Sequence, residues 1–198
     1  ADTAAISGYS ETINGGDLIG YDSDFYTATY LYEDKGEVDY TEYASGTTAG
    51  TLTAGTVAGW ATDSYMTQGD AGSSATRHYQ SYTSYIELVD SDGNKEYEVA
   101  QTKQFAGDVT SNPAGSTGRT TTYAYTQYVD LTTSNTTLQI QQTTVTMPEV
   151  ASGQNGSGIS DTSKTYQDQF GRMIWTMDGN GNVSYTEYDD QTGAVTKT

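Results

Sequence analysis

A four-residue pattern, Tyr-Thr-x-Tyr, recurs along this chain and constrains its fold more than any other feature. It runs from Tyr40 to Tyr43, Tyr82 to Tyr85, Tyr125 to Tyr128 and Tyr185 to Tyr188. The starting tyrosines are 42, 43 and 60 residues apart, close to two, two and three times a unit of about 20 residues, a period typical of repeat architectures. We therefore expect a chain built from repeated structural units.

A longer internal match supports the repeat. Gly36–Tyr43 and Gly181–Tyr188 agree at six of eight positions, and the tetrapeptide that begins at Trp60 resembles the one that begins at Trp175. Chance explains a single short match in a chain rich in Tyr and Thr, but not both. The paired tyrosines and the two tryptophans are therefore predicted to be structural repeat positions.

Each unit has the pattern of a β-hairpin. Residues 183–188 alternate in side-chain character with the period of a strand. The residues before them, 178–181, are Asp-Gly-Asn-Gly, which tolerate positive φ and close tight turns. Residues 91–94 predict a second turn of this kind. Since no apolar stripe with helical spacing persists, we predict an all-β fold of antiparallel β-hairpin repeats forming a sheet, a sandwich or a partial β-spiral.

The composition fits such a sheet but not a thick aliphatic core. Only 34% of residues are hydrophobic, and that fraction includes all 18 Tyr. Thr and Tyr favour strands, and tyrosines that recur with the repeat are expected to form cross-strand aromatic pairs. The aromatic content of 12% argues against a disordered chain.

The charge limits the possible partners. With 26 acidic and 8 basic residues the chain has a formal net charge of −18, which repels nucleic acid and anionic lipid. No apolar run is long enough to cross a membrane. The chain begins at Ala1 without an initiator Met, so we expect a processed protein or a piece of a longer one. Acidity, scarce Lys and abundant Ser and Thr are typical of a secreted bacterial protein, and we expect an extracellular or cell-surface location.

The C-terminal region carries a family resemblance. Residues 166–172, Tyr-Gln-Asp-Gln-Phe-Gly-Arg, are followed by Trp175-Thr-Met-Asp178, Gly181, Tyr185, Tyr188-Asp189 and Gly193. This succession resembles the repeat of the RHS/YD-repeat family, most clearly over residues 165–198, with Asp168 one place later than in the family pattern. The resemblance implies hairpin units in a sheet that spirals on itself, which in large members forms a shell around a toxin or a surface stalk.

Two stretches of small residues interrupt the repeats. Residues 44–59 are predicted to be flexible, and the Gly- and Ser-rich residues 151–163 are typical of a linker. We therefore predict a β-repeat body at 1–148, a flexible linker at 149–164, and a C-terminal unit or exchanged arm at 165–198.

The candidate ligand and modification sites are few. Two segments with oxygen-bearing side chains at alternate positions resemble half of a calcium loop, and their residues are Asp90, Asp92, Asn94, Asp178, Asn180 and Asn182. Turn formation alone explains both segments, so no cofactor beyond a possible calcium ion is predicted. Sequons at Asn135, Asn155 and Asn182 are glycosylation candidates. His78, the one histidine, has no recognisable catalytic partner, so we predict no enzyme.

These features favour a structural role. A repeat sheet without caps leaves open edges, and an open edge accepts a strand from another chain. We expect a subunit of a head-to-tail fibre, with either Ala1 to Gly16 or residues 165–198 as the donated strand. The alternatives are a glycan-binding adhesin, which would use exposed aromatic rings, and a stalk module of a larger RHS/YD-repeat surface protein.

Overall fold

The computed structural model describes residues 37–68 and 76–198, and the possible donor segment at residues 1–16 lies outside them. The strands are β1 (Glu37–Tyr43), β2 (Ala61–Gln68), β3 (His78–Val89), β4 (Lys95–Gln104), β5 (Arg119–Asp130), β6 (Asn135–Thr146), β7 (Thr162–Gln167), β8 (Met173–Met177), β9 (Val183–Tyr185), β10 (Glu187–Tyr188) and β11 (Val195–Lys197). Strands make up 51% of the described residues. These residues contain one short 3-10 turn, Ser152–Gln154, and no α-helix, which confirms the all-β prediction.

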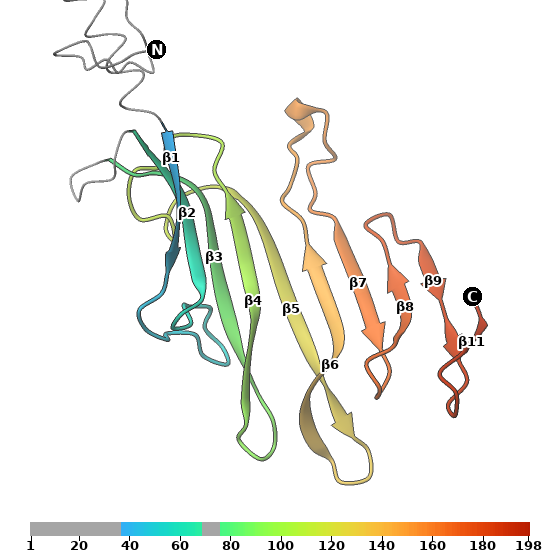
Figure 1. Cartoon of the computed structure of the whole chain (residues 1–198). Helices are drawn as coiled ribbons and strands as arrows, with labels where there is room; N and C mark the ends of the chain where they lie inside the picture. Colours follow the sequence, from blue (N-terminus) through green and yellow to red (C-terminus); the bar gives the residue numbers. More distant parts are fainter. Residues whose placement is uncertain (1–36, 69–75) are drawn as a thin grey trace, which may run out of the picture. The chain divides into compact units, whose positions relative to one another are not determined.

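The strands are connected as consecutive hairpins. β1 to β9 form one nine-stranded sheet in which the order in space is the order in the chain, and β10 and β11 form a separate pair. Each strand runs antiparallel to its neighbours, and the sheet does not close into a barrel. Figure 1 shows β4 to β9 side by side in this order. Of the three arrangements that the sequence left open, the structure therefore shows a sheet.

The described chain divides into two compact units. In the first, which includes residues 37–41, 64–68, 76–80 and 107–116, aromatic rings from three successive strands pack together. The rings of Tyr40 on β1 and Tyr65 on β2 stack with their centroids 5.2 Å apart. The ring centroid of Tyr79, on β3, lies 5.6 Å from that of Tyr65. The guanidinium of Arg77 lies 4.5 Å from the centre of the Tyr65 ring. Cross-strand aromatic pairs hold this unit, as the composition predicts.

The second unit, residues 42–63, 81–106 and 117–198, contains a small core. Ala49, Val57 and Tyr85 are buried together, with Tyr97 and Val99 against them. Ala49 and Val57 belong to the stretch 44–59 that the sequence predicts to be flexible. The backbones of Gly55 and Tyr85 exchange hydrogen bonds of 2.9 and 2.7 Å, so the stretch is fixed across β3 because it supplies the small residues that fit beneath the Tyr85 ring.

Burial is confined to one part of the chain. Every buried residue among those described lies between Ala49 and Leu88. From β4 onward the side chains are exposed or half-buried. A buried core therefore does not hold β5 to β11 together, and backbone ladders, cross-strand pairs and turns must do so.

The last three residues of the predicted linker are part of the sheet. β7 begins at Thr162, inside the range 149–164, and pairs with β6 from Thr146 opposite Thr162 to Gln142 opposite Tyr166. Residues 117–198 belong to a single compact unit. The structure thus places residues 162–164 in a strand, because their Thr-Ser-Lys side chains suit a solvated pleated surface as well as a linker.

One type of turn occurs at three places in the described chain. At Asp90, Asp168 and Asp178 the carboxylate accepts hydrogen bonds from the backbone N–H groups two and four residues later, at 2.8 to 2.9 Å. The fourth residue of each turn is a glycine with φ between +77° and +85°, a conformation that disfavours other residues. The fifth is Asn94, Arg172 or Asn182, whose side chain returns to the same carboxylate.

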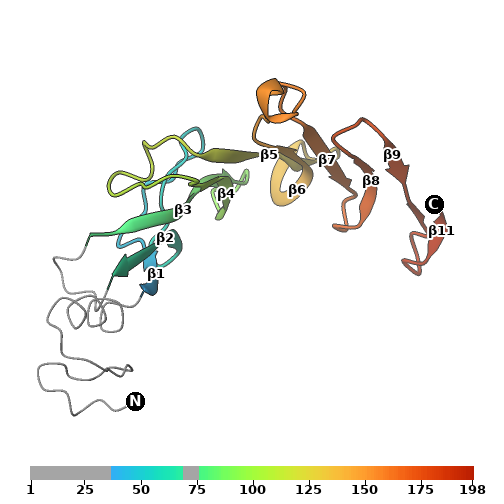
Figure 2. The ribbon, with the colours of Figure 1, turned by 90° about the horizontal axis from the view of Figure 1, so that it is seen from above.

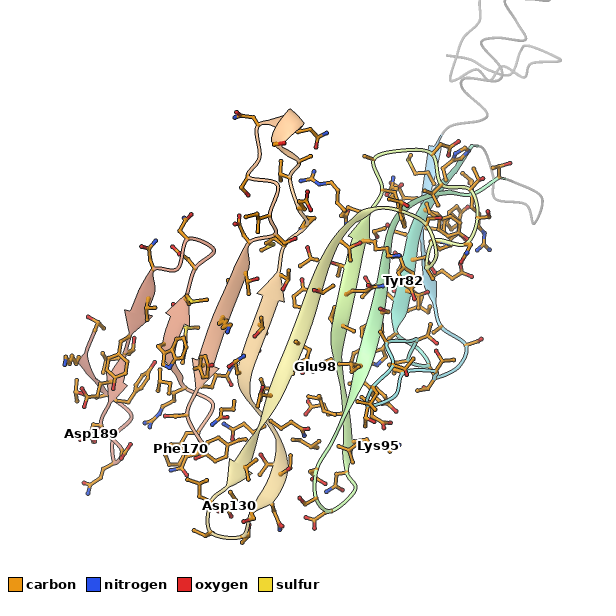
Figure 3. The ribbon with its side chains drawn as sticks, turned by 180° about the vertical axis from the view of Figure 1, so that it is seen from behind. Tyr82, Lys95, Glu98, Asp130, Phe170 and Asp189 are labelled. Atoms are coloured by element: carbon orange, nitrogen blue, oxygen red, sulfur yellow. The ribbon has the colours of Figure 1, made fainter. Side chains whose placement is uncertain are left out.

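Longer turns at Asp130 and Asp189 use the aspartate in a related way. Each carboxylate accepts a backbone N–H and a threonine hydroxyl, from Thr132 and Thr192 respectively. Figure 3 shows Asp130, Phe170 and Asp189 at turns that lie at the same end of the strands of the second unit. An aspartate that binds the amides of its own turn is therefore a recurring structural device of this chain.

These turns predict acid sensitivity. Hydrogen bonds from the turn residues lower the pKa of Asp90, Asp130, Asp178 and Asp189, and the bond from the Lys95 ammonium lowers the pKa of Glu87. A carboxyl group whose pKa is lower in the folded than in the unfolded chain stabilises the fold at pH values above its unfolded pKa, which is about 4. This stabilisation is lost as the pH falls through the folded pKa. The pKa of Glu98 shifts in the opposite direction, because burial and, to a smaller extent, the charge of Glu96 raise it. We expect the urea midpoint to fall steeply below about pH 4.

A pair of variants in one turn checks this expectation. Asp90→Asn removes the charge that the turn amides stabilise. The urea midpoint of this variant should therefore fall less between neutral and acidic pH than that of the wild type. Asp92→Asn is the matched control, since that turn uses the backbone N–H of Asp92 and not its side chain. Equal pH dependence in both variants and the wild type would show that the turn carboxylates do not set the acid limit.

Candidate functional site

The register of the last strands aligns side chains in rows. Gln142 lies opposite Tyr166, Tyr166 opposite Trp175, and Trp175 opposite Tyr185. The rings of Tyr166 and Trp175 stack with their centroids 3.7 Å apart and their planes 20° from parallel. We call Tyr166, Trp175 and Tyr185 the aromatic row. It crosses three successive strands and ends at Tyr185 on the last strand of the sheet.

A second row carries hydroxyl groups. Thr143, Thr165, Thr176 and Ser184 lie opposite one another on β6 to β9. Each is next in sequence to a member of the first row, so these side chains lie on the other face of the sheet. We call this set the hydroxyl row, and it ends at Ser184. Each face of the sheet therefore carries an uninterrupted row of side chains up to β9.

β9 has one side that no other described strand pairs with. It is the last strand in the sheet order. The N–H of Thr186 donates to the carbonyl of Ile174 on β8 over 2.8 Å. Since backbone groups alternate in direction along a strand, Ser184 also faces β8, whereas the N–H and C=O groups of Val183 and Tyr185 point away from it. We call this side, residues 183–185, the free side of β9.

The side chains at this edge are also accessible. Val183 is 61% exposed and Tyr185 is 49% exposed. In Figures 1 and 2, β11 lies beyond β9 on the side away from β8. However, β11 pairs only with β10, through Glu187 opposite Lys197 and Tyr188 opposite Val195. The free side of β9 therefore presents backbone hydrogen-bonding groups and an apolar and an aromatic side chain at once.

Arg172 connects the β7–β8 turn to the β10–β11 hairpin next to this edge. Its guanidinium bonds the Asp168 carboxylate at 2.6 Å and lies 4.8 and 4.9 Å from the ring centres of Phe170 and Tyr188. It also approaches Asp190 at 3.3 Å. The pKa of Asp168 is lowered: burial opposes its ionisation, but the hydrogen bonds from Arg172 and Phe170 outweigh burial. These acids in turn raise the pKa of Arg172, with the Asp168 hydrogen bond as the largest cause.

Tyr188 completes this support. Its hydroxyl donates to the carbonyl of Met173 on β8 over 3.0 Å. Arg172 and Tyr188 together tie the turn before β8 to the β10–β11 hairpin. The single strand that the sequence predicts over 183–188 is divided into β9 and β10 at Thr186, and this tie fixes its second half.

The predicted repeat residues have different environments. Tyr82 and Tyr85 are buried, and the hydroxyl of Tyr125 donates to the carbonyl of Val99 over 2.8 Å. Burial is the largest cause that raises the pKa of Tyr125 to about 12. Tyr43 is 62% exposed, so it is not packed as the repeat would suggest. Trp60 packs edge-on against Tyr85 in the loop before β2, whereas Trp175 lies within β8.

The calcium candidates are two copies of the turn described above. The carboxylates of Asp90 and Asp178 accept hydrogen bonds within their own turns. Asn94 and Asn182 donate to those carboxylates, while Asp92 and Asn180 contribute backbone N–H groups. Turn formation accounts for the spacing of all six. Among the described residues no three His, Cys, Asp or Glu side chains are grouped as metal ligands would be.

The third copy of this turn, at Asp168 to Arg172, is missing from the calcium candidates. Its fifth residue is Arg instead of Asn, so the alternation of oxygen-bearing residues that marked the other two is broken. The signal that would have found it is the shared Asp-x-x-Gly spacing.

The remaining candidates are the histidine and the three sequon asparagines. His78 Nδ1 lies 2.6 Å from Asp108, and both side chains are well exposed. Asn135 begins β6, and Asn155 follows the 3-10 turn in a left-handed conformation. The side-chain nitrogen of Asn182, which would carry a glycan, donates to Asp178 over 2.8 Å.

An open cleft of about 420 Å³ lies at the β5–β6 hairpin end. Its lining includes Tyr128, Asp130, Gln139 and Gln169. Two of these polar groups are already used within the protein, because Asp130 binds Thr132 and Gln139 donates to the carbonyl of Asp168. The cleft therefore offers fewer groups to a ligand than its lining suggests.

No family model, curated protein or solved structure matches this chain. Within the described residues, the structure contains no helix of the length and apolar character that a membrane span requires.

Proposed function

We propose that this chain is an extracellular structural protein, a subunit of a fibre or surface filament, whose copies associate by β-strand pairing at the free side of β9. The observation that carries the proposal is the combination at this edge: backbone groups of Val183 and Tyr185 point outward, beside side chains that are about half exposed or more. Adding a strand satisfies the backbone groups and covers the side chains together. No catalytic role is proposed.

The shortage of buried residues supports a role in assembly. From β4 onward the described sheet buries no residue of its own, although single sheets need a covered face or further strands for independent stability. A partner that continues the sheet would supply more ladder hydrogen bonds and cross-strand pairs. This is the kind of stabilisation on which β4 to β9 already depend.

The stacking of the aromatic row disfavours the adhesin alternative. Sugars bind aromatic residues through the flat face of the ring, but at 3.7 Å Tyr166 and Trp175 cover one face of each other. What the row leaves open is its end at Tyr185, where another strand would bring the next side chain. The geometry thus suits strand addition better than glycan stacking.

The second candidate is a stalk module of a larger RHS/YD-repeat surface protein. The specific observation in its favour is the turn from Asp168 to Arg172, which directly follows Tyr166 and Gln167 and joins β7 to β8 as a hairpin. In this alternative the chain is still structural, but separate copies would not associate.

Val183→Pro tests the proposal. Val183 is the first residue of β9 and its N–H points outward, so proline removes a donor for the incoming strand and leaves the β8 ladder intact. We expect the wild type to associate with rising concentration in sedimentation velocity, more strongly in salt because the charge of −18 is screened, while the variant stays monomeric. Val183→Thr, which keeps the N–H and the β-branched shape, is the control and should associate.

A wild-type chain that stays monomeric at high concentration and high salt would overturn strand pairing and leave the stalk module as the better explanation. Association of Val183→Pro at wild-type strength would place the contact away from β9.

A further inference from the structure

We infer that the strand that pairs with the free side of β9 is β9 of a second copy, antiparallel, with a two-fold axis at Ser184. This inference rests on the proposed function and specifies its partner. A symmetric contact uses the free side of β9 in both copies, so it gives a closed pair, and growth of a filament from this pair requires a second contact.

The backbone pattern of β9 suits such a pair. Val183 and Tyr185 point their N–H and C=O groups outward, and Ser184 points its groups to β8. In an antiparallel pair centred on Ser184, Val183 of each copy lies opposite Tyr185 of the other, and these positions exchange hydrogen bonds on both sides of the axis. The two Ser184 residues then form the close pair without hydrogen bonds between them. Every outward backbone group of the strand is satisfied.

The side chains also match across the axis. On one face Tyr185 meets Val183 of the second copy, so the aromatic row of each copy continues onto an apolar residue of the other. Aromatic and β-branched residues are favourable cross-strand neighbours. On the other face Ser184 meets Ser184, which joins the two hydroxyl rows. Both exposed side chains, Val183 and Tyr185, become covered in one step.

The local charge permits contact between copies. Residues 162–198 contain five acidic and three basic residues, whereas the whole chain contains 26 and 8. The strong negative charge of the chain therefore resides almost entirely before β7. A contact at β9 brings together the least charged parts of the two copies, and this lowers the repulsion that a contact elsewhere would meet.

The other end strand fits less well. β1 and β9 are the two ends of a nine-stranded antiparallel sheet, and an odd number of alternating strands gives both the same direction. A copy added by simple translation would place β1 parallel to β9. Because Gly36–Tyr43 and Gly181–Tyr188 match in sequence, that register would also bring Glu42 beside Glu187. The two-fold pair keeps the antiparallel pattern and avoids this like-charge contact.

Ser184→Cys tests the inference, because the chain contains no cysteine. In the two-fold pair the Cα atoms of the two residues 184 lie about 4.5 Å apart, within the range that a disulfide bridges. Under mild oxidation we expect a disulfide-linked dimer that a reducing agent converts back to monomer. Adding Val183→Pro to the same chain should prevent this dimer. Thr176→Cys, on the neighbouring strand β8 in the same row, is the matched control and should give no dimer.

A mixture of Asp39→Cys and Ser184→Cys separates the alternatives, since Asp39 matches Ser184 in the sequence repeat. Crosslinks that need both variants, with none from Ser184→Cys alone, would overturn the two-fold pair and retain strand pairing of the head-to-tail kind. If Ser184→Cys forms no crosslink although the wild-type chain associates in sedimentation, the two-fold pair alone is overturned. An absence of both crosslinks and association would overturn the proposed function with it.

Discussion

Replacing Tyr85 by alanine should lower the free energy of unfolding by about 3 to 5 kcal/mol, the range found when large buried aromatic side chains are truncated. Tyr85 is 7% exposed and lies at the centre of the small core. Its ring contacts the loop residues Ala49 and Val57, and Trp60 packs edge-on at 4.9 Å. Burial raises the pKa of its hydroxyl, which donates to the carbonyl of Ala61 over 2.6 Å.

The effect is expected to be large because the described core is small. The residues from β4 onward bury nothing further, so a cavity at Tyr85 has few neighbours that could move into it. Urea melts followed by circular dichroism give the free energy. Tyr85→Phe keeps the ring and loses one hydrogen bond, for an expected cost of about 1 kcal/mol.

Tyr43→Ala is the matched control from the same sequence motif. Its side chain is 62% exposed, so the expected change is within about 0.5 kcal/mol. If the two alanine variants unfold at the same urea concentration, the core described around Tyr85 does not stabilise the protein.

The contrast between these two tyrosines shows what the sequence could predict. Alternation and turn residues identified the β-hairpins, because both signals are local: the turns at Asp90 and Asp178 form where Gly93 and Gly181 supply the positive φ. Burial is not local. Tyr43 and Tyr85 occupy the same place in the repeat, but only Tyr85 is covered, because the loop at residues 44–60 folds over β3.

The aromatic row could be anticipated only in part. The sequence marked Trp175 and Tyr185 as repeat residues, but which residue faces which depends on register. A shift between Tyr166 and Gln167 sets the register of β7 and β8, and no sequence pattern reveals such a bulge. The free side of β9 likewise follows from the order of all nine strands. The role of Arg172 was missed because two of its partners, Tyr188 and Asp190, come from a hairpin that is separate from its own turn.

Arg172→Ala should release the β10–β11 hairpin from β8 while leaving the core around Tyr85 folded. Three kinds of contact are lost together: the 2.6 Å ion pair with Asp168, the approach to Asp190, and the stacking on Phe170 and Tyr188. Because β10 and β11 contain only two and three residues, their own ladder is too short to keep them in place.

Amide hydrogen exchange measures this release at specific residues. The loss of two cation–π contacts and an ion pair predicts protection lower by roughly tenfold or more at Thr186 and Asp189, whose N–H groups donate to Ile174 and Ala194, with unchanged protection at Tyr85. Lys197→Ala, which removes an exposed cation from the same hairpin, is the control and should leave both regions unchanged. Arg172→Lys separates charge from shape: lysine keeps the charge but lacks the planar fork that binds Asp168 and stacks on the rings, so we expect it to restore only part of the protection. Full restoration by lysine would show that charge alone anchors the hairpin, and unchanged exchange in Arg172→Ala would show that Arg172 does not anchor it.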